Sequence, residues 1–291
     1  MSRAPFPTIA FATLLCGGVA IGFAGILMRL SPVAPVASAF WRMALAAPLL
    51  WIWTALTRQS ESAAARRTGF SRALVLAGLF FAGDIGIWHV SLHYTTVANA
   101  TLLSNFAPVF IALWMWLAMG ERLSSAFVAS MLIALAGAVL LVGPSAAAGA
   151  EPLLGDVLGL ITAVFYAGYQ LIVKNAREEY STARLMAWTS TVTAVALFPF
   201  ALLSSGPLVP QQLSGWLPLV ALAVIAQIGG QTSIAYALAH LPASFSSVSL
   251  LIQPCTAAVA AWILLGERMS APQITGGLLV LAGIWLSKRT S

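Results

Sequence analysis

Two residues of opposite charge, Arg42 and Asp84, lie well inside long apolar stretches of this sequence. A charge at the centre of a lipid bilayer costs at least about 2.5–3.5 kcal/mol, so such a residue usually faces a cavity or a partner. A guanidinium can attract a carboxylate, and a carboxyl group can titrate or receive a cationic group. The two residues therefore favour a cavity for a zwitterion or a polar metabolite, with a structural ion pair as the alternative.

Histidine and glutamine side chains are further polar candidates inside the apolar stretches. His89 and His93 are four residues apart, as are Gln227 and Gln231, so each pair would share one face of a helix. His89 would lie about 140° around the helix from Asp84, which does not favour a proton path along a single face. We expect the histidines to act in proton transfer or helix packing, and the glutamines to bind substrate or bridge helices.

Prolines and aromatic residues complete the candidates. Asn105 and Gln253 each precede a proline, Pro108 and Pro254, and a proline frees backbone carbonyls that can line a cavity. Aromatic side chains could form cavity walls, although Trp and Tyr also face lipid or pack between helices. Those inside the apolar stretches include Trp41, Trp88, Tyr166, Tyr169, Trp188 and Tyr236. The residues that we predict to bind substrate or to take part in coupling are Asp84, Arg42, His89, Asn105, Gln227, Gln231, Gln253, Trp41, Trp88 and Tyr166.

The composition places these residues in a membrane protein. Of the 291 residues, 60% are hydrophobic and only 8% are charged, which is more apolar surface than a soluble domain could bury. The net charge of +6 comes from basic residues scattered singly in short loops, so we expect no nucleic-acid partner. Cys16 and Cys255 lie in apolar runs and indicate neither a disulfide nor a metal site, and we expect no cofactor.

Turn signals divide the chain into ten stretches, each close to the roughly 20 residues that a membrane-spanning helix needs. The predicted spans are 8–29, 35–57, 71–94, 97–119, 125–143, 153–174, 183–204, 213–239, 244–265 and 271–287. At 1.5 Å per residue, Arg42 would lie about 10 Å from the outer end of the second span, and Asp84 about 20 Å from the inner end of the third. Their levels then differ by only a turn or two, which allows them to pair.

The basic residues indicate the orientation of these spans. If the N-terminus is cytoplasmic, that side of the membrane receives eleven of them, and only Arg29 and Arg268 lie in the opposite loops. The eleven are Arg3, Arg58, Arg66, Arg67, Arg72, Arg122, Lys174, Arg177, Arg184, Lys288 and Arg289. Cytoplasmic loops carry an excess of Lys and Arg, so we expect both termini in the cytoplasm and the protein in the inner membrane.

One short corner occurs twice in the sequence. "MGERLSS" at 119–125 (the first corner) returns 146 positions later as "LGERMSA" at 265–271 (the second corner), and Pro108 falls on Pro254 at the same offset. Several matches at one offset indicate an internal repeat. Each copy would hold five spans, and an odd number inverts the second copy. We therefore predict an all-α polytopic membrane protein with two inverted five-helix halves, 1–146 and 147–291.

The corners themselves favour a structural role. Gly120 and Gly266 suit the left-handed conformation that ends a helix. We expect Glu121 and Glu267 to cap helices or pair with neighbouring charges at the interface, because charges at span ends are tolerated. The repeat is unequal at the polar positions, since Trp188 and Gly230 stand where the first half has Arg42 and Asp84.

Motifs along nearly the whole chain resemble the EamA family of the drug/metabolite transporter superfamily. They are "FWRMALAAPLL" at 40–50, "ANATLLSNFAPVF" at 98–110 and "SSVSLLIQPCTAAVAAWILLGERMS" at 246–270. The resemblance implies a secondary transporter, often an exporter of amino acids or other small metabolites, with a central cavity between the two halves.

Physical reasoning from the residues leads to the same class. Inverted repeats place a substrate site near the midplane, where one half can move against the other, and protons are a candidate coupling ion. The alternatives are a channel or facilitator for a small polar solute, an intramembrane enzyme, and a scaffold or sensor. No span carries a recognisable selectivity filter, and no metal-ligand cluster or paired nucleophile and base can be identified, so we expect a transporter rather than a channel or an enzyme.

Overall fold

The computed structural model describes residues 7–57, 71–91, 94–95, 97–142, 152–266 and 269–290. Throughout these ranges the regular structure is helical and contains no strand. The helices are α1 (Thr8–Gly22), α2 (Ala24–Arg29), α3 (Pro35–Thr57), α4 (Arg72–Ser91), α5 (Val97–Ser104), α6 (Ala107–Met119), α7 (Ser125–Val142), α8 (Pro152–Ala176), α9 (Thr182–Leu203), the short 3₁₀ turn η3 (Leu213–Gly215), α10 (Trp216–Ala221), the π-helix η4 (Leu222–Gln231), α11 (Thr232–Leu238), α12 (Ala243–Ser249), α13 (Ile252–Leu265) and α14 (Ala271–Thr290).

Nine segments of the described chain are long and apolar enough to cross a membrane. They are Thr8–Arg29, Pro35–Thr57, Arg72–Ser91, Ala100–Met119, Ser125–Val142, Leu153–Ala176, Thr182–Leu203, Leu213–Leu238 and Ala243–Leu264, and they coincide with the first nine predicted spans. The tenth predicted span corresponds to α14, which has 20 residues but is not among the nine. Polar and basic residues near its two ends, such as Gln273, Lys288 and Arg289, lower its apolar content.

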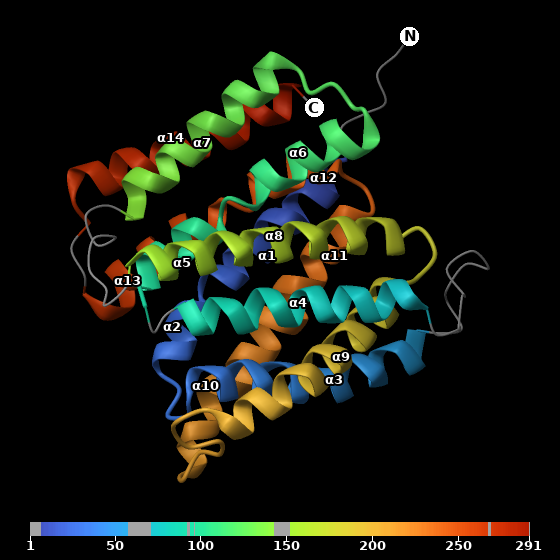
Figure 1. The fold of residues 1–291 in the computed structure, drawn as a ribbon, viewed down its shortest axis with the longest axis vertical. Coiled ribbons are helices and arrows are strands. Elements are labelled where there is room, and N and C mark those ends of the chain that lie inside the picture. Colours follow the sequence, from blue (N-terminus) through green and yellow to red (C-terminus); the bar gives the residue numbers. More distant parts are fainter. Residues whose placement is uncertain are drawn as a thin grey trace.

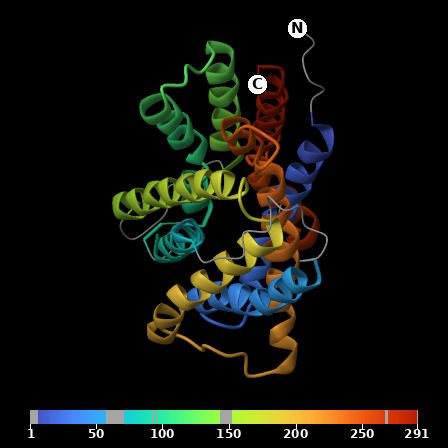
Figure 2. The ribbon, with the colours of Figure 1, turned by 90° about the vertical axis from the view of Figure 1, so that its right-hand side faces the viewer.

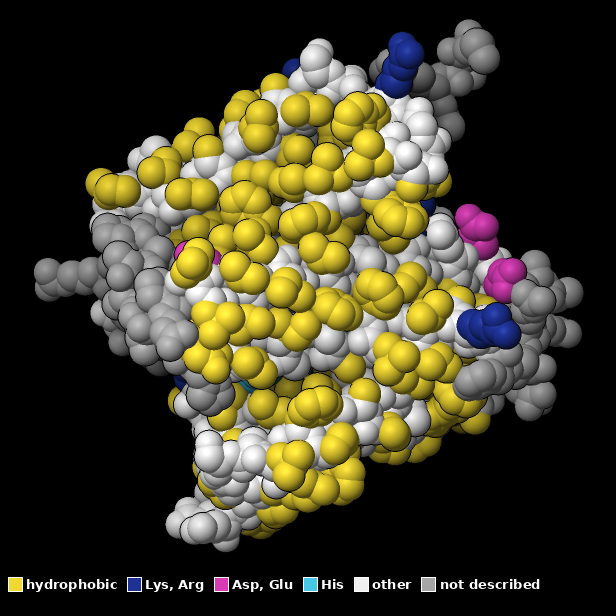
Figure 3. Space-filling view, viewed as in Figure 1, with side chains coloured by type: hydrophobic (Ala, Val, Ile, Leu, Met, Phe, Trp, Pro, Cys, Tyr) yellow, Lys and Arg dark blue, Asp and Glu magenta, His cyan; other side chains and the backbone are white. Residues whose placement is uncertain are grey.

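Most of the long helices, including α3, α4, α8, α7 and α14, are stacked along the long axis of the molecule and run across it, whereas α1 and the segment from α10 to α11 run obliquely (Figures 1 and 2). Helices α7 and α14 lie side by side at one end of this axis, and α3 and α9 lie side by side at the other (Figures 1 and 2). Between these two pairs, α8 packs on α4 and α5, and α1 packs on η4 and α11. Hydrophobic side chains cover most of the visible surface, and the most prominent charged side chains lie at its right-hand edge (Figure 3). This distribution suits helices that cross a bilayer from left to right in that view.

The fourth and ninth segments are each broken near a proline. Between α5 and α6 the chain turns at Asn105–Phe106, and between α12 and α13 it turns at Leu250–Leu251. Pro108 and Pro254 then lie in the first turns of α6 and α13, where a missing N–H removes no helical hydrogen bond. The prolines therefore begin new helices and leave irregular backbone in the middle of both segments.

Both corner glycines have the left-handed conformation that their sequence pattern favours. Gly120 has a φ of 67° and Gly266 a φ of 69°, and their N–H groups donate to Met115 O and Ala261 O respectively. Glu121 is exposed at the protein surface, whereas Glu267 lies outside the described residues. After the second corner, the side chain of Gln273 accepts a hydrogen bond from the Ser270 N–H at 2.9 Å, which caps α14.

The α7–α14 contact is held by glycines that let the two backbones approach. A Cβ atom at Gly276 would lie 2.5 Å from the Leu141 nitrogen, and one at Gly137 would lie 2.6 Å from the Gly276 carbonyl oxygen. Small residues of this kind are enriched where helices pack closely in membranes. The contact joins the last helices of the two predicted halves.

Candidate functional site

A cavity of about 600 Å³ lies between the helices of the two predicted halves. This volume is within the range of about 300–1,000 Å³ that is typical of small-molecule sites. Its walls come from segments far apart in sequence, including α2, α3, α4, α5, α8, η4 and α13. Eight of the ten predicted site residues line it, namely Arg42, Asp84, Trp88, His89, Asn105, Tyr166, Gln231 and Gln253.

Arg42 reaches the cavity from α3 and is held in place by a glutamine of the other half. Its Nε donates a hydrogen bond to Gln227 Oε1 at 3.2 Å, and Gln227 Nε2 donates in turn to Ser190 Oγ at 3.0 Å. The guanidinium carbon also lies 5.8 Å from the centre of the Phe81 ring, within cation–π range. The terminal nitrogens of Arg42 make no hydrogen bond to any described residue, which leaves its planar fork available to a carboxylate.

Asp84 enters the same cavity from α4. Within the described structure it forms neither a hydrogen bond nor a direct ion pair with Arg42, although the two charges are close enough to interact electrostatically. Both side chains are half-buried, with their remaining exposure toward the cavity. The two charges therefore attract each other without forming an ion pair, and each group remains free to meet an oppositely charged group of a ligand.

His89 lies near the cavity wall but is held by packing. Its Nδ1 is 2.6 Å from the Ile85 carbonyl oxygen, so this nitrogen carries a proton and donates to it. Its Nε2 is 3.1 Å from Met28 Sδ, and the residue is 4% exposed. His93, its predicted neighbour on the same helix face, lies outside the described residues.

Gln231 has a polar side chain that lines the cavity without a described hydrogen-bond partner. It is 1% exposed, and neither its amide oxygen nor its amide nitrogen makes a hydrogen bond of normal geometry to the described protein. It approaches the hydroxyl groups of Tyr166 and Tyr169, and Tyr166 itself accepts a bond from Gln253 Nε2 at 3.4 Å. A buried polar group without a partner is destabilising by about 1–3 kcal/mol, so this amide is well placed to bind a ligand or water.

The π-helix η4 carries both candidate glutamines. A π-helical turn accommodates one more residue than an α-helical turn, and such turns are often found at functional sites. Gln227 is fully buried and lies behind Arg42, whereas Gln231 lines the cavity. The two glutamines therefore have different surroundings: one supports the arginine, and the other is available to a ligand.

Asn105 lies at the break of the fourth segment. Its Nδ2 donates to the Thr101 carbonyl oxygen at 2.7 Å, and both residues line the cavity together with Ser104. The sequence reasoning did not single out Thr101, Ser104 or Ser38. Two of them could have been found by helical spacing, since Ser38 is four residues before Arg42 and Thr101 is four residues before Asn105.

Trp41 and Gln227 are the two candidates that do not line the cavity. Trp41 Nε1 donates to the Leu208 carbonyl oxygen at 2.7 Å, and its ring packs edge-on against Trp216 at 4.8 Å. These contacts join α3 to α10 and to the loop that precedes it, so Trp41 has a packing role in this structure.

The residues that line the cavity extend toward one end of the helices. Its lining continues from Arg42 and Asp84 to Arg29 and Gln273, which lie near the end of α2 and the start of α14. Toward the opposite end, Phe11 packs on Phe245 with ring centres 5.5 Å apart. Near that end, Lys174 Nζ donates to the carbonyl oxygens of Leu238 at 3.3 Å and Leu241 at 3.0 Å.

The helices and the polar cavity among them define a multi-pass membrane protein of the transporter class. The profile of the EamA-like transporter family matches the chain twice, over residues 8–143 and 153–289. The chain belongs to this family.

Relatives along most of the chain are also named as transporters. A protein of Archaeoglobus fulgidus named as an uncharacterized transporter is 27% identical over 287 residues, covering 96% of this chain and 95% of its own. The pseudopaline exporter of Pseudomonas aeruginosa strain UCBPP-PA14 is 28% identical and covers 86% of this chain and 85% of its own. A probable terminal-alkyne amino-acid exporter of Streptantibioticus cattleyicolor is 29% identical and covers 75% and 74%. These names support transport, rather than catalysis, as the function of this chain.

A solved crystal structure has the same fold. It matches with a TM-score of 0.81 over 96% of both chains, at 18% sequence identity. The helix arrangement is therefore one that is already known from experiment.

Proposed function

We propose that this protein is a secondary transporter that exports small metabolites, such as amino acids, across the inner membrane. The observation that carries the proposal is the cavity between the two halves, into which Arg42 and Asp84 project without neutralising each other directly. A cation and an anion on facing helices match the carboxylate and the ammonium group of a zwitterion. Gln231 and Asn105 then supply neutral polar groups to the same ligand.

The proposed topology has ten membrane crossings, with α14 as the tenth. Lys288 Nζ lies 5.1 Å from the centre of the Phe11 ring, so the end of α14 and the start of α1 lie on the same side of the molecule. A chain whose two ends meet on one side crosses the membrane an even number of times. Nine apolar segments and α14 give that even number, and the excess of basic residues favours the cytoplasm for the side of the termini.

Two inverted halves are supported by the helix contacts as well as by the doubled corner. At the offset of the repeat, α3 corresponds to α9 and α7 corresponds to α14. Each of these two contacting pairs therefore joins equivalent helices of the two halves. In the same way, α1 corresponds to α8, and α4 corresponds to η4 and α11. The packing of α8 on α4 is therefore equivalent to the packing of α1 on η4 and α11. The breaks before Pro108 and Pro254 and the left-handed Gly120 and Gly266 also correspond at the offset of 146 residues.

With the termini in the cytoplasm, we propose that the cavity opens to the outside near Arg29 and Gln273 and that the contacts of Phe11 and Lys174 close the inside. Alternating access requires a second conformation in which the contacts around Phe11 and Lys174 open and the end near Arg29 closes. An outward-accessible site is the state from which an exporter releases its substrate.

Transport by the purified protein in liposomes is the direct test. Radiolabelled amino acids would be offered with and without a pH gradient, and empty liposomes would serve as the control. We expect saturable, substrate-specific flux that responds to the gradient if protons are the coupling ion. Ion currents in the absence of substrate would instead favour a channel, and the absence of flux for every amino acid would remove that substrate class.

A further inference from the structure

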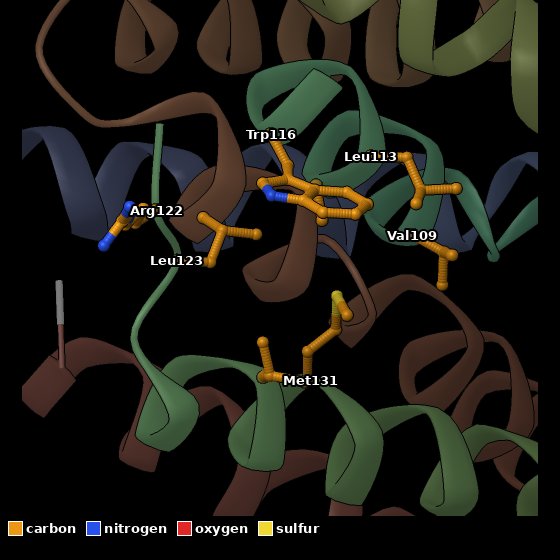
Figure 4. A pocket seen from close by; sticks show the side chains of 8 residues that line it. Val109, Leu113, Trp116, Arg122, Leu123 and Met131 are labelled. Atoms are coloured by element: carbon orange, nitrogen blue, oxygen red, sulfur yellow. The ribbon is translucent and has the colours of Figure 1, made fainter. Parts of the chain in front are cut away.

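A second pocket lies on the outer surface of the molecule, away from the central cavity. It has a volume of about 480 Å³ and lies between α6, the first corner and α7. Figure 4 shows Arg122 and Leu123 at one end, Val109 and Leu113 at the other, and Trp116 and Met131 between them. We call this pocket the α6–α7 groove. It shares no lining residue with the central cavity.

The groove combines apolar walls with a single charge at one end. Apart from Arg122, its lining residues are all apolar: Val109, Ala112, Leu113, Trp116, Leu123, Val128 and Met131. Trp116 is 57% exposed and Leu113 is 42% exposed, so the groove opens at the surface of the protein. A ligand for this site therefore needs an apolar part for the walls and an anionic part for the arginine.

The charge of Arg122 is not balanced by an ion pair with any described residue. Arg122 is exposed and makes no hydrogen bond or ion pair with any described residue. Its acidic neighbour Glu121 lies close enough to Lys174 for electrostatic attraction, and no ion pair joins it to Arg122. A guanidinium at a span end, beside an apolar groove, is complementary to a phosphate group.

The length of the groove matches one leaflet of a bilayer. Along α6, Val109 lies ten residues before the helix end at Met119, which corresponds to about 15 Å at 1.5 Å per residue. This is half of the roughly 30 Å hydrocarbon core. An acyl chain that starts at the first corner and follows the groove to Val109 would thus reach the middle of the membrane.

From the charge, the walls and the length, we propose that the α6–α7 groove is a binding site for an anionic phospholipid. One acyl chain lies along Trp116, Leu113 and Met131, and the phosphate of the headgroup is held by Arg122. The site lies in the leaflet on the side of the first corner. Because α6 continues through the break at Asn105 into α5, a lipid seated here contacts the same segment that lines the central cavity.

Lipid binding to the full-length protein can be measured without any assay of transport. The purified protein in detergent would be titrated with phosphatidylglycerol or with phosphatidylcholine of the same acyl chains, and bound lipid would be counted by native mass spectrometry. One basic residue near a membrane surface contributes about 1 kcal/mol toward an anionic lipid, so we expect a preference of about fivefold for phosphatidylglycerol. Arg122→Gln should abolish that preference, and Arg72→Gln, at another exposed arginine near a helix end, should keep it.

A second variant tests the contribution of the acyl chain separately from that of the headgroup. Leu113→Trp fills the groove from an exposed position, so it should reduce binding of both lipids while leaving the thermal midpoint in detergent unchanged. Equal binding of the two lipids by the unaltered protein, or an unchanged preference in Arg122→Gln, would overturn the proposal. Displacement of the lipid by millimolar inorganic phosphate would also overturn it, because the site would then recognise a free anion.

Discussion

Arg42 and Asp84 both line the cavity, and no direct ion pair joins them. The sequence could predict that they lie at similar depths, because depth follows from helix rise and span boundaries. It could not predict that Gln227 and Ser190 would support the arginine from behind, because that contact joins residues 185 positions apart in sequence. It also gave no sign of the π-helix that carries Gln227 and Gln231.

Replacing Asp84 by Asn tests whether this carboxylate acts in transport. Asn keeps the shape and the hydrogen-bonding capacity but removes the charge and the titration. We expect a folded protein whose flux falls by at least about tenfold and no longer varies across about pH 5.5 to 8. A purely structural role would instead lower the thermal midpoint, and the additional change Arg42→Gln would restore it. Normal flux in a well-folded Asp84→Asn protein would rule out the functional role.

The two glutamines should respond differently to the same substitution. Gln227→Leu removes the hydrogen bonds to Arg42 and Ser190, so we expect a loss of stability of about 1–3 kcal/mol and weaker binding of carboxylate substrates. Gln231→Leu removes an amide with no described partner, so stability should be kept or raised while substrate affinity falls. Thermal midpoints in detergent and the KM for flux would distinguish the two. If both variants lost the same stability, our assignment of separate roles would be wrong.

Among the elements, the left-handed glycines of the two corners were predicted from the sequence, whereas the fourth and ninth spans were predicted as continuous and the breaks before Pro108 and Pro254 were not. The second half has glycine where the first half has Asp84, and packing gives a reason for this difference that the sequence alone does not reveal. A Cβ atom at Gly230, the position that matches Asp84, would lie 2.7 Å from Ile21 Cγ1, because α1 packs closely against η4. The close approach of α1 therefore leaves no room for a second acidic residue.

Two adjacent glycines of α14 provide a matched test of the helix contact with α7. Gly276→Ala would place a Cβ atom 2.5 Å from the Leu141 backbone nitrogen, so we expect a loss of about 1–3 kcal/mol from overpacking. At Gly277 the nearest atom is 3.6 Å from the new Cβ, and the same change should be neutral or stabilise the helix by about 0.5–1 kcal/mol. Thermal unfolding in detergent measures both, and equal midpoints would mean that the α7–α14 contact is looser than described.

At the scale of the whole molecule, sequence reasoning located nine apolar segments and placed a helix at the position of α14. It predicted α14 as an ordinary span, whereas its composition is the least apolar of the long helices. Hydropathy reports only how well a helix suits lipid, and α14 lies along α7 for much of its length, so contacts with protein replace part of its contact with lipid.

The inverted topology makes a prediction about the two corners. Single cysteines at Ser125 and Ser270, in a protein lacking Cys16 and Cys255, should react with a membrane-impermeant reagent from opposite sides. Labelling would be compared in intact cells and in inverted vesicles. Reaction of both cysteines from the same side would refute the inverted repeat, whatever the transported substrate is.

The contact between Lys174 and the carbonyls of Leu238 and Leu241 has a consequence for the population of conformations. In the proposed outward-open state, the two hydrogen bonds of Lys174 help to close the cytoplasmic end, so a change of this one side chain should alter the free energy of closure. Lys174→Met keeps most of the apolar stem but removes both donors, and a change of about 1.4 kcal/mol would alter the ratio of closed to open molecules tenfold. A cysteine at Ser104, which lines the cavity, should then react faster from the cytoplasmic side. An unchanged rate would mean that the hydrogen bonds of Lys174 do not contribute to this balance.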